Sequence, residues 1–226
     1  TIRVLAAEGC EVVIPRAQGC CGALMLHSGL EQDAAETARQ FIDVFEAEAA
    51  DIDTLVINAA GCGSTLKDYG HLLRNDPVYA DRAHALADKC QDISELLAEL
   101  PPQAPRHSVP LRIAYHDACH LQHAQGVRAE PRQVLKTIPD LEISEIPEAE
   151  ICCGSAGIYN LIEPGAADEL GDRKARHILT TGADAIVSSN PGCLLQIASR
   201  LEQSGTPRRT YHLVELVDAS IRGQTL

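Results

Sequence analysis

The chain has 226 residues, of which 45% are hydrophobic and 23% charged, a composition typical of a globular protein with a packed core. Its 32 acidic residues outnumber its 19 basic ones, and the net charge of −13 disfavours binding to nucleic-acid phosphates or anionic lipid headgroups. Aromatic residues make up only 3% and Trp is absent, which argues against a stacking platform for single-stranded nucleic acid.

Short β-rich runs alternate with amphipathic helical stretches along the whole chain. In the first half the pattern predicts strands over 11–14 and 54–57, and helices over 31–50, 62–74 and 78–89. A proline-rich segment over 100–110 is typical of a linker. In the second half the pattern predicts strands over 111–116, 142–146 and 186–189, and helices over 129–138, 166–181 and 191–204. This alternation favours an α/β fold with parallel sheets.

The nine cysteines are the most informative residues of the chain. No secretory signal or transit peptide is visible in the first residues, so we expect reduced thiols that serve metal binding or catalysis rather than disulfides. Two adjacent pairs are each followed by glycine, in the strings Cys20-Cys21-Gly22 and Cys152-Cys153-Gly154. Cys10 and Cys90 have no such context, and we interpret them as packing residues.

An internal repeat links the two halves of the chain. The first cysteine pair maps onto the second at an offset of 132, and Cys62 maps onto Cys193 at an offset of 131. The string DISELL (92–97) likewise resembles YHLVEL (211–216). We therefore predict two units, residues 1–105 and 106–226, each a small parallel-sheet sandwich with flanking helices.

The second unit holds one further cysteine, Cys119, which lies 33 positions before Cys152. The corresponding position in the first unit would precede Thr1. We therefore expect the first unit to be truncated at its N-terminus, with an incomplete set of three cysteines: Cys20, Cys21 and Cys62.

The cysteines of the second unit follow three predicted strands, and the carboxyl ends of parallel strands meet at one sheet edge. Cys119, Cys152, Cys153 and Cys193 are therefore expected to form a four-thiolate set. Such a set suits either tetrahedral zinc or an iron–sulfur cluster. The C-x₂₋₄-C knuckles of structural zinc sites are absent, and adjacent cysteines suit a cluster of several irons better than one zinc ion.

Three histidines surround Cys119: His116, His120 and His123. They could act as metal ligands, but four cysteines already complete a cluster. We therefore favour the interpretation that these histidines cap the following helix or donate hydrogen bonds to sulfur. Asp117 is likewise interpreted as a cap of that helix.

These motifs resemble the cysteine-rich CCG domains of the iron–sulfur subunit of glycolate oxidase. The matching strings are CCGALMLHSG, INAAGCGSTLKDYG, AYHDACHLQHAQGV, ICCGSAGIYNL and NPGCLLQ. They lie in both units, so the resemblance spans nearly the whole chain. The wider family includes heterodisulfide reductase B subunits, whose units end in C-x-x-C, whereas Cys62 and Cys193 stand alone here.

The resemblance implies a [4Fe–4S] cluster bound by Cys119, Cys152, Cys153 and Cys193, with Cys20, Cys21 and Cys62 as further metal-binding candidates. It implies an electron-transfer subunit that is not catalytic alone and passes electrons from flavin-containing oxidase subunits toward a membrane acceptor. A ferredoxin-like N-terminal region of the same subunit is a further implied partner, and its cysteine run is absent here. The implied location is cytoplasmic, peripheral to the inner face of the membrane. No apolar stretch approaches the roughly 18 residues of a membrane-spanning helix.

Two alternatives remain open at this point. The chain could be a zinc-bound or metal-free structural module that docks a flavin subunit, since the C-x-x-C ending and one first cysteine are missing. It could also carry out thiol–disulfide chemistry at a cluster, as in the heterodisulfide reductase relatives.

Overall fold

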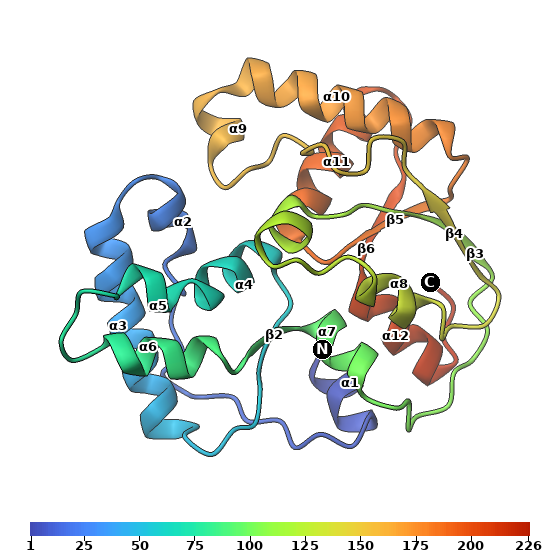
Figure 1. The fold of residues 1–226 in the computed structure, drawn as a ribbon. Helices are drawn as coiled ribbons and strands as arrows, with labels where there is room; N and C mark the ends of the chain where they lie inside the picture. The colour runs from blue at the N-terminus through green and yellow to red at the C-terminus, as the bar shows by residue number, and fades with distance from the viewer.

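The computed structural model describes residues 1–226 and contains two sheets, in which every strand pairing is parallel (Figure 1). The larger sheet has the strand order β4-β3-β5-β6. Its strands are β3 (Leu111–Tyr115), β4 (Leu141–Glu145), β5 (Ala185–Ser188) and β6 (Arg209–His212). The α/β class with parallel strands is therefore confirmed.

Helices cover both faces of the larger sheet. They are α8 (Glu130–Leu135), α10 (Pro164–Thr180), α11 (Pro191–Gln203) and α12 (Leu213–Arg222). The short helix α9 (Tyr159–Ile162) contacts α10. In Figure 1, α10 and α11 lie on one side of the sheet, and α8 and α12 on the other. Successive side chains of β3 point to opposite faces of the sheet. Ile113 and Tyr115 therefore belong to one apolar core, and Ala114 belongs to the other.

The smaller sheet pairs β1 (Leu55–Ile57) with β2 (Cys90–Asp92). Its helices are α2 (Ala23–His27), α3 (Glu31–Glu48), α4 (Ala60–Lys67), α5 (Tyr69–Leu72) and α6 (Ala80–Ala87). They form a lobe of their own on the left of Figure 1. Its core contains Phe41 and Ile42 of α3, together with Cys90, which packs as the sequence predicted.

Two helices of the first half pack against the second half at their junction. Helix α1 (Ile2–Ala7) packs on α12, where Arg3 pairs with Asp218 at 2.6 Å. Helix α7 (Ile93–Glu99) packs on α8. Val4 and Leu5 of α1 and Ile93 and Leu97 of α7 belong to the same apolar core as β3 and β5. The core of the larger sheet is therefore built from both halves of the sequence.

The repeated strings DISELL and YHLVEL correspond to the same local structure, a strand that leads directly into a capped helix. Asp92 at the end of β2 accepts a hydrogen bond from the backbone N–H of Ser94, and Glu95 accepts one from the N–H of Asp92. His212 and Glu215 form the equivalent capping box on α12. The similarity of the two strings did not by itself predict these strands and helices.

One predicted strand is wrong, that over 11–14, where the chain is irregular. The equivalent strand of the second half, β4, pairs with β3. The smaller sheet has only β1 and β2, so this segment has no neighbour to pair with, and Val13 and Ile14 remain exposed. An unpaired strand leaves its backbone groups without hydrogen-bond partners and is not stable on its own.

The other predicted elements are confirmed with shifts of a few residues. The helix expected over 62–74 divides into α4 and α5 at Asp68, and the linker over 100–110 has no helix or strand. None of the helices is both long and apolar enough to cross a lipid bilayer.

Candidate metal centre

The loops after β3, β4 and β5 meet at one edge of the larger sheet, because the strands are parallel. Cys119 follows β3, the pair Cys152 and Cys153 follows β4, and Cys193 lies in the first turn of α11 after β5. The convergence expected from the sequence is thus present in the structure.

The four thiols form a continuous chain of contacts. Cys119 interacts with Cys152, Cys152 with Cys153, and Cys153 with Cys193. Cys153 and Cys193 are buried, and the other two are half-buried. Four sulfur atoms gathered within a protein interior form a site for a soft or borderline metal.

His116 belongs to the same group. One of its ring nitrogens and the sulfur atoms of Cys153 and Cys193 all lie within 4.8 Å of one another. The side chain is 1% exposed, and its ring points into the thiol group. Its interaction with the Cys193 thiol agrees with the expected hydrogen bond to sulfur and not with a helix cap.

Hydrogen-bond donors surround the sulfur atoms. The Asn190 amide donates to Cys193 Sγ at 3.1 Å, and the backbone N–H of Gly154 donates to Cys152 Sγ at 3.3 Å. A ring nitrogen of His120 lies 3.6 Å from Cys119 Sγ, as the sequence analysis expected for this histidine. Such donors stabilise negative charge on bound sulfur and orient the ligands.

The thiol contacts separate the pKa values of neighbouring cysteines. The pKa of Cys152 is lowered chiefly by the Cys119 thiol and then by Cys153. The pKa of Cys193 is lowered by the Cys153 thiol, with a smaller contribution from His116. The pKa of Cys119 and that of Cys153 are raised by the same contacts and by burial. These contacts therefore favour the thiolate form, which binds metals, at Cys152 and Cys193.

Glycine is required directly after each cysteine pair. Gly154 has a φ of +92°, and a Cβ there would lie 2.2 Å from the carbonyl oxygen of Ala167 in α10. Gly22 has a φ of +78°, and its Cβ would lie 3.3 Å from the carbonyl oxygen of Ala34 in α3. Only glycine adopts this left-handed backbone without strain and allows a helix to approach so closely.

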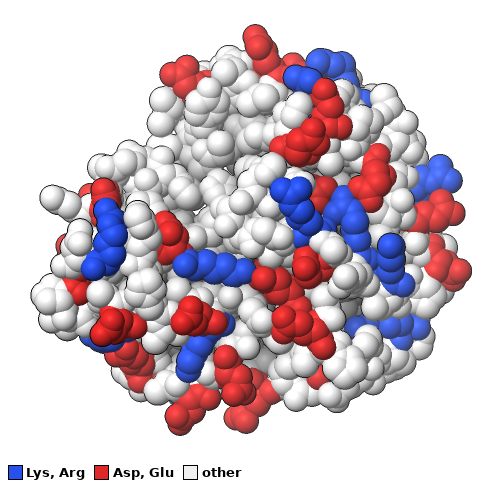
Figure 2. All heavy atoms as spheres, in the orientation of Figure 1, with Lys and Arg blue, Asp and Glu red and all other residues white.

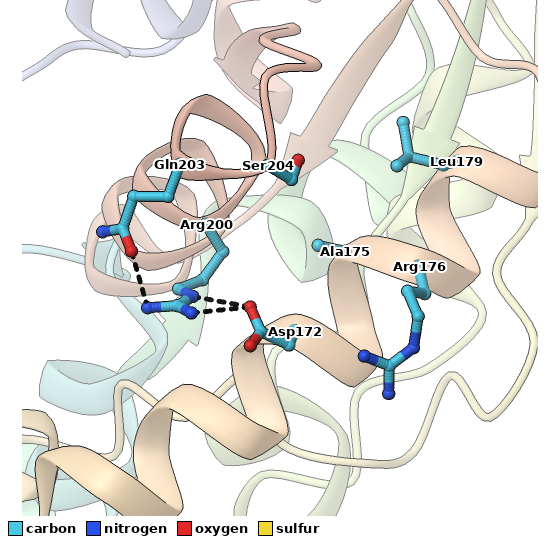
Figure 3. Close-up of a pocket in the computed structure, with 7 residues that line it drawn as sticks. All are labelled: Asp172, Ala175, Arg176, Leu179, Arg200, Gln203 and Ser204. Atoms are coloured by element: carbon cyan, nitrogen blue, oxygen red, sulfur yellow. Dashed lines mark hydrogen bonds and ion pairs between the residues drawn. The ribbon is translucent and has the colours of Figure 1, made fainter.

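The scaffold behind the thiols is held by ion pairs. Asp117 forms two hydrogen bonds with Arg132, at 2.8 and 2.7 Å, which fix the β3 loop on α8. The expected helix cap by Asp117 is therefore wrong, since its carboxylate is engaged elsewhere. Arg200 of α11 binds Asp172 of α10 beside a cavity of about 390 Å³ that contains no cysteine (Figure 3). This pair fixes the helix that carries Cys193 against the helix that packs on the cysteine pair.

A buried cation lies beside the thiols. Lys174 of α10 is 1% exposed, and its Nζ donates to the carbonyl oxygens of Glu148 and Ala149 at 2.8 and 3.3 Å. Burial lowers the pKa of Lys174, and the neighbouring Cys153 thiol opposes that shift. Glu150, Asp117 and Cys152 also raise its pKa, so Lys174 lies among both the thiols and nearby carboxylates. The sequence alone did not indicate this residue, because a lysine within an amphipathic helix normally lies in solvent.

The first half contains a second, smaller set of cysteines. Cys21 and Cys62 interact, and this contact lowers the pKa of Cys62 to about 7 while raising that of Cys21. Cys62 occupies the first turn of α4, as Cys193 does in α11. The backbone N–H of Gly22 donates to Cys20 Sγ at 3.4 Å, as Gly154 does to Cys152. Cys10 lies apart from this set and packs against the core of the larger sheet.

The two cysteine sets approach each other across the junction. The rings of His27, after the first pair, and His120, after Cys119, have centroids 4.7 Å apart. The Gln125 amide donates to the carbonyl oxygen of Ala60 at 2.9 Å. The π-helical turn η1 (His120–Ala124) forms this contact with α4 and is visible at the centre of Figure 1. Such turns occur frequently at functional sites.

The repeated arrangement of thiols, glycine turns and helix starts has a counterpart among known families. The sequence pattern of the cysteine-rich domain called CCG matches residues 1–67 and 113–198. The chain belongs to this family. The two matched segments also confirm that the CCG unit is repeated.

Individual relatives agree with the family assignment. A probable glycolate oxidase iron–sulfur subunit of Bacillus subtilis (strain 168) is 41% identical over 221 residues, which cover 96% of this chain and 49% of that protein. Lactate utilization protein A of Halalkalibacterium halodurans is 31% identical, covering 96% of this chain and 88% of that protein. Lactate utilization protein A of Geobacillus thermodenitrificans is 32% identical, covering 96% of this chain and 90% of that protein. The chain thus spans about half the length of the first relative. The resemblance inferred from the cysteine motifs is confirmed.

Proposed function

We propose that this chain is an electron-transfer module of a 2-hydroxy-acid oxidase and holds a [4Fe–4S] cluster on Cys119, Cys152, Cys153 and Cys193. The observation that carries the proposal is the convergence of these four thiols from three loops at one sheet edge. The donor set fits the cluster, because iron–sulfur clusters are bound by four thiolates and tuned by hydrogen bonds to sulfur. A bound cluster supplies one-electron transfer.

The residues of this chain have definite tasks in such a module. The two glycine-dependent turns present adjacent cysteines to a common centre, and the first turns of α4 and α11 present Cys62 and Cys193. Asn190 and the Gly154 N–H donate to sulfur, and Lys174 adds positive charge. The buried positions of Cys153 and Cys193 exclude water from one side of the site. Together these residues bind and protect an anionic centre rather than act on a substrate.

The first unit, residues 1–105, would contribute a second, three-thiol metal site through Cys20, Cys21 and Cys62. The contact between His27 and His120 supports a position of this site beside that of the second unit, residues 106–226. A short route between the two sites would support electron passage through the chain.

The electron donor would be a flavin-containing subunit that oxidises glycolate or a related 2-hydroxy acid, and the acceptor would lie at the inner face of the membrane. The relatives named for glycolate oxidase and lactate utilization support this assignment. The surface between α2 and α9, next to both cysteine sets, is hollowed and carries few charged side chains (Figure 2). Leu24 and Leu161 are exposed there, and α9 buries none of its side chains. This surface offers apolar contacts close to the cluster for the flavin subunit.

The test is anaerobic reconstitution followed by measurement of bound iron, sulfide and the EPR signal. The second unit should bind about four iron and four sulfide. The Cys119→Ser variant should lose this content, and Cys10→Ser, which alters a cysteine outside both sets, should retain it. A colourless protein that takes up no iron would contradict the proposal.

A zinc-bound docking module is the second candidate. It is favoured by one observation, the cluster of His116, Cys153 and Cys193 within 4.8 Å, which a single tetrahedral ion could bridge. Metal analysis separates the candidates, because this alternative predicts about one zinc per site and no iron.

A further inference from the structure

Helix α4, which carries Cys62 of the first cysteine set, is attached to the second unit at its first residue. Ala60 is fully buried and belongs to the apolar core that α10 and α11 form with the larger sheet. Its backbone N–H donates to the carbonyl oxygen of Ser189 at 3.3 Å, and its carbonyl oxygen accepts from the Gln125 amide at 2.9 Å. Residues of the second unit therefore hold the backbone of α4 two positions before Cys62.

Both of these partners lie on loops that carry thiols of the second set. Gln125 directly follows the turn η1, which begins directly after Cys119. Ser189 is followed by Asn190, whose amide donates to Cys193 Sγ at 3.1 Å. A cluster bound by the second set would fix these loops, and with them the two groups that hold α4.

The glycines on either side of Cys62 differ in the space around them. A Cβ on Gly63 would lie 2.7 Å from Nε2 of Gln125, whereas a Cβ on Gly61 would have no atom within 4 Å. Glycine at position 63 leaves room for the Gln125 amide to reach Ala60, because no side chain separates the amide from the helix. The contact between the two units is therefore built into the turn that presents Cys62.

We propose that metal binding at the two cysteine sets is coupled, because a cluster on the second set fixes Cys62 of the first set in its metal-binding position through the Gln125 amide. This inference rests on the proposed function. Ordering these loops is part of the cost of binding metal at either set, so the set that fills first lowers that cost for the other. Such coupling is reciprocal, so metal on the first set also strengthens binding at the second. Gln125 is thus a positioning residue that acts through Ala60.

The experiment uses the full chain with Cys20→Ser and Cys21→Ser, so that Cys62 remains as the reporter thiol of the first set. The rate at which iodoacetamide alkylates Cys62 is measured anaerobically by peptide mass spectrometry, before and after reconstitution of the second set. The cluster should slow this alkylation by roughly five-fold or more, the lower end of typical coupling between sites. Cys10, which lies outside both sets, should react at the same rate in both states.

Two matched changes beside Cys62 test the contact itself. Gly63→Ala places a methyl group against the Gln125 amide and should abolish the slowing, whereas the methyl group of Gly61→Ala enters open space and should leave the slowing unchanged. Alanine forms helices better than glycine, so both variants should retain α4. A merely structural effect would change the Cys62 rate equally with and without the cluster, and the ratio of the two rates would not move.

Iron and sulfide content, measured on the same samples, separates the inference from the proposed function. Protein with about four iron whose Cys62 reacts equally fast with and without the cluster would overturn the coupling and leave the proposed function intact. Slowing that persists in Gly63→Ala would also overturn it, because cluster charge alone would then protect Cys62. If Gly63→Ala does not fold, Gln125→Met, which removes the donor at similar size, decides in the same way. Protein without iron would overturn both the coupling and the proposed function.

Discussion

The two cysteine sets share a backbone scaffold but differ in the side chains around it. Each has a cysteine pair, a left-handed glycine, a helix packed on that glycine and a later cysteine in the first turn of a helix. The second set adds a fourth thiol and the buried His116. Ala167 of α10 contacts Gly154, and Ala34 of α3 contacts Gly22. Counted from these alanines, the residue of the first unit that corresponds to Lys174 is Phe41. The scaffold therefore fixes where sulfur atoms lie, and the surrounding side chains determine how much charge the site can hold.

The largest expected effect concerns the glycine turns. Gly154→Ala should be far more harmful than Gly22→Ala, because its Cβ would lie 2.2 Å from a backbone oxygen compared with 3.3 Å in the first unit. Both changes also place a side chain in the left-handed region, at a cost of about 1–2 kcal/mol. Urea unfolding should show that Gly154→Ala loses several kcal/mol in free energy of unfolding, on the order of the largest single-residue effects. The iron content of this variant should fall as well. Equal losses for the two variants would contradict this reading of the turns.

A smaller effect is expected for the charge beside the thiols. Lys174→Met removes a buried cation and should lower the midpoint potential of the cluster, on the order of the 59 mV that corresponds to a tenfold change for one electron. Phe41→Leu, the matched change in the first unit, should leave that potential unchanged. Spectroelectrochemical titration of both variants is the measurement. An unchanged potential in Lys174→Met would show that its charge is screened from the site.

The smallest effects concern the two helix caps, which respond to pH in opposite directions. Burial raises the pKa of Asp92 to about 6, so its contribution to stability is present below the usual 3.8 and is lost as pH rises through about 6. Burial lowers the pKa of His212 below 6.5, so its contribution is present above 6.5 and is lost as pH falls through the lowered value.

Urea unfolding between about pH 4 and pH 7 compares wild type with Asp92→Asn and His212→Asn, which retain capping side chains. Wild type should lose stability relative to Asp92→Asn as pH rises, and relative to His212→Asn as pH falls. Each cap contributes about 1 kcal/mol. Parallel pH profiles for all three proteins would contradict the two opposed pKa shifts.

Much of the site could be predicted from the sequence, because the repeat and the strand pattern together bring the cysteines to one edge. The side chains that surround the cysteines could not be predicted in this way. Lys174 lies on the face of α10 that packs inward, and periodicity alone assigns a lysine to the solvent face. His116 follows the end of β3, and its direction depends on long-range contacts, the Asp117–Arg132 pair and the hydrogen bond to Val187. The segment over 11–14 has residues typical of a strand, but no neighbouring strand pairs with it. The presence of such a neighbour depends on tertiary structure and not on local sequence.

The most direct test of the central claim compares Cys153→Ser with Cys21→Ser, the matched change in the first set, in anaerobically reconstituted protein. Iron, sulfide and the EPR signal should be lost from the second site in Cys153→Ser, while Cys21→Ser should retain that site's signal. An unchanged signal in Cys153→Ser would mean that these convergent thiols do not bind the cluster.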